Sequence, residues 1–108
     1  MIKIGVARPD AKLTEAFCDS AKGWGFYNGE LRHNSNSSGK KYGESLKPGN
    51  VLGVMLDMIN GELSYTINKK TFGVAYKNAA LKTGKLVAAC APIYQHDKFH
   101  LNMLLRED

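Results

Sequence analysis

The residues whose types and spacing come closest to a metal-binding pattern are His96, Asp97 and His100. Two histidines four residues apart can hold one zinc ion when both lie on the same face of a helix. Here the segment is typical of a loop running into a strand, where residues four apart lie about 13 Å from each other. That separation is too large for the two imidazoles to share one tetrahedral zinc ion.

Other patterns that support catalysis do not occur in a recognisable form. No Gly-rich phosphate loop follows a strand and opens a helix, and neither a nucleophile elbow nor an arrangement of paired carboxylates is evident. We therefore predict that the chain is not an enzyme and that it has no catalytic residue, no cofactor and no metal.

Cys18 and Cys90 are the two cysteines, too few for a disulfide framework. Cys90 lies in the small-residue run LVAACAP, which predicts a buried thiol rather than a reactive one. No apolar run approaches the roughly 18–20 residues of a membrane span, and Met1 to Ile4 leads into a strand pattern rather than a secretory signal. These features favour a reducing, cytoplasmic location and no membrane partner.

The formal net charge is +5, from 15 Lys and Arg against 10 Asp and Glu. Most of the lysines fall beside predicted turns, as in Lys40-Lys41 and Lys69-Lys70. Lysine at such places keeps sheet edges soluble. A nucleic-acid surface more often interleaves basic residues with stacking aromatics, so the pattern favours solvated loop charge over nucleic-acid binding.

The stretch from Val51 to Tyr76 predicts an antiparallel meander of three strands. Asn60-Gly61 fits a type I′ turn, which needs positive φ at both central residues, and Asn68 supplies a similar corner after the second strand. The first strand, Val51 to Met58, is apolar on both faces, which predicts a central strand covered on both sides.

Residues alternate along the second and third strands of this meander. The second is expected to place Leu63, Tyr65 and Ile67 on one face, and the third to alternate Phe72, Val74 and Tyr76 with Gly73 and Ala75. Period-two patterns also predict strands at 3–7, 23–27, 30–33, 86–91 and 99–103.

Turns and loops join these strands. Asn28-Gly29 fits a type I′ turn, and Lys47-Pro48-Gly49-Asn50 fits a type II turn. Two long polar loops are expected, from Arg8 to Lys22 and from Asn34 to Lys41. No window shows a sustained helical period, so we predict one all-β domain over residues 1–108, a sandwich of two antiparallel sheets.

Trp24 and Asp57 could suggest a ligand platform and a catalytic acid. Trp24 lies between glycines in a strand, which favours core packing. Asp57 ends an apolar strand just before a turn, which favours a carboxylate that stabilises the turn.

The chain resembles a SPRY domain, and the resemblance runs from Ile4 to about Leu101. The segments that carry it are Ile4 to Ala7, Gly23 to Phe26, Leu31 to Asn34, Tyr42-Gly43, Gly49 to Asp57, Gly61 to Tyr65, Asn68, and Phe72 to Tyr76. The resemblance implies a bent, concanavalin-like sandwich that acts as a protein-interaction module. It also implies a place within a larger protein, such as a ubiquitin-ligase adaptor, and a peptide or protein partner bound by loops at one end.

The start of the chain departs from the family, whose members usually carry one or more strands before the equivalent of Ile2 to Ala7. The domain is therefore expected to lack the usual N-terminal strand or strands. Either the start of the domain is trimmed or a sheet edge is left bare, and a bare edge would invite strand pairing with a second copy or with a partner.

Partner-binding residues follow from the resemblance and from the loops. In SOCS-box relatives, a tyrosine after Leu and a Val-Trp-Gly run line a peptide pocket, and these fall on Arg32 and on Ile93, Tyr94 and Gln95. The pocket's arginine belongs to the segment that this chain lacks, so that pocket is not expected to be intact. Asp19 in the first long loop is a further candidate, able to meet a basic partner.

Two other functions stay open beside the protein-interaction module. A curved sandwich is also the lectin architecture, and Tyr94, His96 and Asp97 offer a hint of a carbohydrate site. Nucleic-acid binding through Lys40-Lys41 and Lys69-Lys70 is the other alternative, and its signature would be a steep loss of affinity with salt.

Overall fold

The computed structural model describes residues 2–12 and 14–92 of the chain. These residues form seven strands and one short 3-10 helix. The strands are β1 (Ile2–Ala7), β2 (Gly23–Tyr27), β3 (Glu30–Arg32), β4 (Leu52–Asp57), β5 (Glu62–Ile67), β6 (Lys70–Lys77) and β7 (Val87–Pro92), and the helix η1 (Ala79–Lys82) precedes β7.

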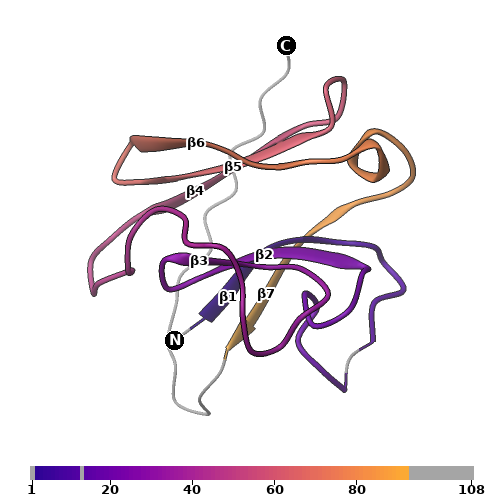
Figure 1. Cartoon of the computed structure of the whole chain (residues 1–108), viewed down its shortest axis with the longest axis horizontal. Helices are drawn as coiled ribbons and strands as arrows, with labels where there is room; N and C mark the ends of the chain where they lie inside the picture. The colour runs from indigo at the N-terminus through magenta and orange to yellow at the C-terminus, as the bar shows by residue number, and fades with distance from the viewer. Residues whose placement is uncertain (1, 13, 93–108) are drawn as a thin grey trace.

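Two antiparallel sheets make up the fold, as Figure 1 shows. Sheet A has four strands in the order β3-β2-β1-β7, and sheet B has three in the order β4-β5-β6. The prediction of an all-β, two-sheet sandwich is confirmed. Among the described residues, no helix has the length and apolar character needed to cross a bilayer.

The core lies between the two sheets. Trp24 and Phe26 of β2 pack with Leu63, Tyr65 and Ile67 of β5, all of them buried. Trp24 is only 3% exposed, which confirms its predicted place in the core. The alternation along β5 is confirmed as well, because its odd-numbered residues are buried and its even-numbered ones are half-buried.

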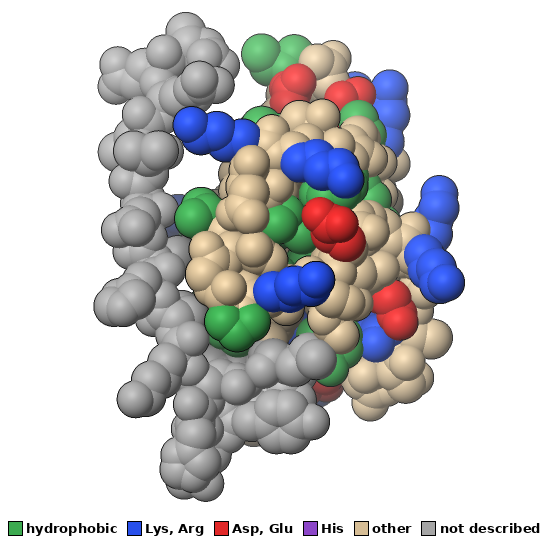
Figure 2. Space-filling view, turned by 90° about the vertical axis from the view of Figure 1, so that its left-hand side faces the viewer, with side chains coloured by type: hydrophobic (Ala, Val, Ile, Leu, Met, Phe, Trp, Pro, Cys, Tyr) green, Lys and Arg blue, Asp and Glu red, His purple; other side chains and the backbone are tan. Residues whose placement is uncertain are grey.

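Two tight turns have the predicted geometry. Asn28 and Gly29 both have positive φ, 47° and 83°, in the two-residue connection between β2 and β3. Asn68 and Lys69, with φ of 51° and 70°, connect β5 to β6 in the same way. The tip of that second hairpin lies at the left of Figure 1, the side that Figure 2 faces.

The turn between β4 and β5 differs from the prediction. Among Met58 to Gly61 only Gly61 has a positive φ, 67°, so Asn60-Gly61 is not a type I′ turn. The Asp57 carboxylate instead holds a four-residue connection, accepting hydrogen bonds from the backbone N–H of Ile59 at 3.0 Å and of Asn60 at 3.1 Å. Asp57 therefore has its predicted role, and its hydrogen bonds explain why the turn takes another form.

The position of β4 also corrects a prediction. Within residues 2–12 and 14–92, β4 pairs only with β5 and is an outer strand of sheet B, not a central one. Val54 and Met55 are 39% and 46% exposed. The meander connectivity places β5 in the middle, and an apolar pattern on both faces cannot by itself specify which strand of a meander is central.

The alternation predicted for β6 is broken by irregular pairing. The register shifts twice along β5 and β6, and Gly73 has a φ of 85°. As a result Val74 is 52% exposed, while Phe72 and Tyr76 pack against the core. A bulge of this kind inserts a residue and changes the face on which the following side chains lie.

The bare sheet edge that one of the two alternatives expected does not occur at β1. β1 lies inside sheet A, paired with β2 on one side and with β7 on the other. Cys90 of β7 is exposed, not buried as predicted. The sequence pattern missed both features because the pairing of β1 with β7 joins segments about 80 residues apart, which local periodicity does not encode. The strand expected at 99–103 lies outside the described residues.

Candidate functional site

The face of sheet A that points away from sheet B is covered by the long loop between β1 and β2. Phe17 and Cys18 of this loop are buried against Ala7 and the small residues of β7, forming a cluster separate from the main core. Gly25 of β2 makes the close contact possible. A Cβ at Gly25 would lie 2.9 Å from the Cys18 Sγ atom, nearer than real side chains approach.

Asp19, which follows Cys18, ties the loop to β1. Its Oδ1 accepts a hydrogen bond of 2.9 Å from the Lys3 ammonium, and both side chains are largely buried. The Lys3 Nζ atom also lies 6.0 Å from the centre of the Tyr27 ring on β2. An ion pair this shielded from water is screened less by salt than a surface pair, so Asp19 is a structural anchor of the loop.

Arg32 lies on the same face, at the end of β3 and opposite Gly25 of β2. Its side chain is not solvated, since the residue is only 6% exposed. The guanidinium donates a 2.6 Å hydrogen bond to the Glu30 carboxylate and lies 5.2 Å from the centre of the Tyr27 ring. The Nε atom of Arg32 has no hydrogen-bond partner among the described residues.

The structure therefore brings together two of the residues that the sequence nominated. The Arg32 guanidinium lies near the Tyr27 ring. Asp19 is linked to the same ring through Lys3, whose ammonium pairs with Asp19 and also lies near Tyr27. Lys3, Tyr27 and Glu30 were not predicted as members of this cluster. The alternation of β1 gave a signal that could have found Lys3, because it places the lysine on the face opposite Ile2, Ile4 and Val6.

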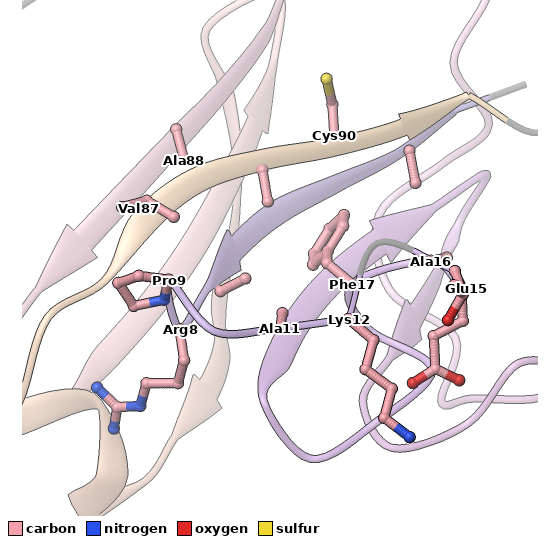
Figure 3. Close-up of a pocket in the computed structure, with 14 residues that line it drawn as sticks. Arg8, Pro9, Ala11, Lys12, Glu15, Ala16, Phe17, Val87, Ala88 and Cys90 are labelled. Atoms are coloured by element: carbon pink, nitrogen blue, oxygen red, sulfur yellow. The ribbon is translucent and has the colours of Figure 1, made fainter.

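A cavity of about 670 Å³ lies beside this cluster, between the β1–β2 loop and β7. Its walls are mostly small and apolar, including Ala11 and Phe17 of the loop and Ala89 of β7. Figure 3 shows the Phe17 ring directed from the loop toward the sheet, while Lys12 and Glu15 extend from the loop. The run from Phe17 to Asp19 thus joins the cavity to the charged cluster.

Cys18, buried on the inner side of the loop, is not a nucleophile at neutral pH. Burial raises the pKa of its thiol to about 11, well above that of an exposed thiol. Burial also raises the pKa of Tyr76, whose hydroxyl donates a 2.7 Å hydrogen bond to the Gly25 carbonyl and links sheet B to this part of sheet A. The raised pKa values keep both the Cys18 thiol and the Tyr76 hydroxyl protonated at neutral pH. The two side chains therefore serve packing and hydrogen bonding in this part of sheet A.

The remaining predicted site residues, Ile93, Tyr94 and Gln95, lie outside the described residues, as do the histidines at 96 and 100. Among the described residues, no group of three or more His, Cys, Asp or Glu side chains could hold a metal ion. The structure thus places Arg32 and Asp19 and leaves the other three as predictions.

Comparison with protein families matches residues 1–106 of the chain to the SPRY domain. The chain therefore belongs to the SPRY domain family, as its sequence pattern indicated. SPRY domains are generally protein-interaction modules and are not an enzyme family. Comparison with curated proteins gives no match.

Proposed function

We propose that this SPRY domain binds a short peptide or a protein surface through the β1–β2 loop and the cavity beside it. The observation that carries the proposal is the cavity of about 670 Å³, open between a long loop and a rigid sheet and lined mainly by small apolar side chains. Sites for small ligands and peptide side chains are usually concave and apolar, with a few polar groups that fix orientation.

The charged side chains that would orient a partner lie on the loop side of the cavity. Lys12 and Glu15 are exposed on the loop and line its outer wall. The Lys3–Asp19 pair, which does not line the cavity, fixes the loop against β1. A partner would place an apolar side chain in the cavity and its polar groups against Lys12 and Glu15. Asp19 and Arg32, which do not line the cavity, would contribute by holding the loop and the neighbouring strands in place.

Ile93, Tyr94 and Gln95 complete the proposal, because they follow β7 directly in the chain. The cavity wall includes β7, and we propose Tyr94, two residues after β7 in the chain, as a residue that contacts the partner. Aromatic residues carry a large share of the binding energy at many interfaces. We further propose that the domain serves as the adaptor part of a larger cytoplasmic protein.

Screening the domain against a peptide array tests this proposal. Val87 lies in the cavity wall and is 40% exposed, so Val87→Trp should fill the mouth of the cavity and abolish binding of the selected peptides. Val74→Trp is the matched control, since Val74 is similarly exposed but lies on β6. Tyr94→Ala should weaken binding without lowering the melting temperature. Equal binding by the Val87→Trp variant and the unaltered domain would refute the cavity as the site.

A further inference from the structure

One end of the molecule gathers most of its net positive charge. Lys40, Lys41 and Lys47 lie in the segment between β3 and β4, and Lys69 and Lys70 lie at the tip of the β5–β6 hairpin. We call these five residues the lysine end. The two segments contain these five lysines and one acidic residue, Glu44, so together they carry a net charge of +4. The net charge of the whole chain is +5.

Specific contacts bring the two segments together. Asn68 at the hairpin tip donates its backbone N–H to the Val51 carbonyl at 2.9 Å, and its side chain accepts from the Val51 N–H, also at 2.9 Å. Tyr42, next to Lys41, packs its ring 5.9 Å from that of Phe72 and donates a 2.6 Å hydrogen bond to the Gly73 carbonyl. These contacts bring the chain next to Lys41 and Lys47 against the β5–β6 hairpin, whereas Lys40 lies near Ala75 and Tyr76, further along β6.

All five lysines are exposed, and none forms an ion pair with another residue of the described part. Figure 2 views this end of the sandwich and shows Lys and Arg side chains spread over it, with hydrophobic side chains and some Asp and Glu side chains between them. Like charges held near one another repel, so binding a segment of opposite charge is favoured.

The chemistry of this end fits carboxylates better than nucleic-acid bases. Binding single-stranded nucleic acid usually relies on exposed aromatic rings on which bases stack. Here Tyr42 and Phe72 pack edge to face against each other and against the core, and the Lys70 ammonium lies 5.5 Å from the centre of the Phe72 ring. The rings thus support the lysines and do not form a stacking platform.

We infer that the lysine end is a second interaction surface, which takes an acidic, Asp- and Glu-rich segment of a partner protein. None of the five lysines lines the cavity. A negative result for one surface therefore does not affect the proposal for the other. The partner's carboxylates would lie across the hairpin tip and the neighbouring loop, each meeting one or two ammonium groups.

Fluorescence anisotropy with a labelled peptide of alternating Glu, Asp and Ser tests the inference on the full chain. The double variant Lys69→Glu/Lys70→Glu should lower the affinity by about tenfold or more, and the affinity of the unaltered chain should fall as salt is raised. Lys47→Glu, in the other segment, should weaken binding by a smaller factor. The matched control is Lys82→Glu/Lys85→Glu, which changes the net charge equally but away from the lysine end.

The inference fails if the control pair weakens peptide binding as much as Lys69→Glu/Lys70→Glu, because only the net charge would then matter. It also fails if a single-stranded oligonucleotide of the same charge binds more tightly than the peptide, which would identify nucleic acid as the favoured partner. Thermal melting of each variant checks that the fold is retained. If the hairpin variant unfolds, the peptide affinities of Lys47→Glu and of a single Lys82→Glu control are compared instead. The inference then fails if the two variants lose the same affinity.

Discussion

Trp24 of β2 is a buried residue of sheet A that contacts side chains from outside its own strand. It is buried between two neighbours, with the His33 ring stacked 4.9 Å from its own and the Arg8 guanidinium 5.7 Å from its centre. The Arg8 side chain in turn donates hydrogen bonds to the carbonyls of Ala80 and Thr83 and so ties η1 to sheet A. A residue that looks like a ligand platform in the sequence is thus the centre of a structural network.

Replacing Trp24 with alanine should lower the free energy of unfolding by about 3–5 kcal/mol, the usual loss for a buried aromatic side chain. Urea denaturation of Trp24→Ala beside the unaltered chain measures this, provided that circular dichroism replaces the lost tryptophan fluorescence. An unchanged midpoint would mean that the indole does not contribute to the core.

The two thiols should differ sharply in reactivity. Cys90 is exposed, whereas Cys18 is fully buried with its pKa raised to about 11. Because the thiolate is the reactive form, a thiol reagent at pH 8 should modify Cys90 rapidly and Cys18 only on unfolding. Mass spectrometry of the partly labelled protein measures how fast each cysteine is modified. Fast labelling of both cysteines in the folded chain would contradict the burial of Cys18.

The raised pKa of Cys18 also predicts how stability changes with pH. The folded state holds the thiol proton to a higher pH than the unfolded state, whose cysteine loses it near pH 8.5 (about the value of a free thiol). The contribution to stability is therefore complete below that pH and is lost as the pH rises toward 11. The free energy of unfolding should fall over this range, with a shallower slope in Cys18→Ala.

At the scale of strands and turns, the features that were predicted correctly are ones specified by residues close together in the sequence. The turns at Asn28-Gly29 and Asn68-Lys69 and the alternation of β5 were predictable because two or three residues specify them. The outer position of β4 and the inner position of β1 were not, since both depend on which distant strand pairs with them.

The same limit applies to the candidate site. Asp19 and Arg32 could be nominated from a loop and a family resemblance, whereas Lys3 and Tyr27 come beside them through strand pairing. Glu30 contacts Arg32 along the same strand, and only the alternation of β3 could have indicated it. The cavity likewise depends on β7 lying beside β1, a contact between the two ends of the described chain. No local pattern contains that information.

Gly25 offers a test of how the β1–β2 loop is seated. In Gly25→Ala the new methyl group would press on Cys18 and Phe17, which must move away from β2. We expect a loss of stability of about 1–3 kcal/mol and faster labelling of Cys18, both measured against the unaltered chain. Unaltered labelling of Cys18 in this variant would show that the loop is not packed on Gly25.

For the molecule as a whole, the sandwich is a frame with polar loops and turns at its periphery. Sheet B closes the core on one side of sheet A, and the β1–β2 loop covers the other side. The surfaces proposed for partners, the cavity and the lysine end, both lie where loops or hairpin tips meet strands. This is the usual arrangement for binding sites on β scaffolds, since loops vary while the sheets hold their position.

Hydrogen–deuterium exchange of the chain with and without its best array peptide tests the central claim most directly. We predict slower exchange in the β1–β2 loop and in β7, where the peptide would cover the cavity, and unchanged exchange in β4 and β5. Protection confined to sheet B, with the β1–β2 loop exchanging as fast as in the free chain, would contradict the account.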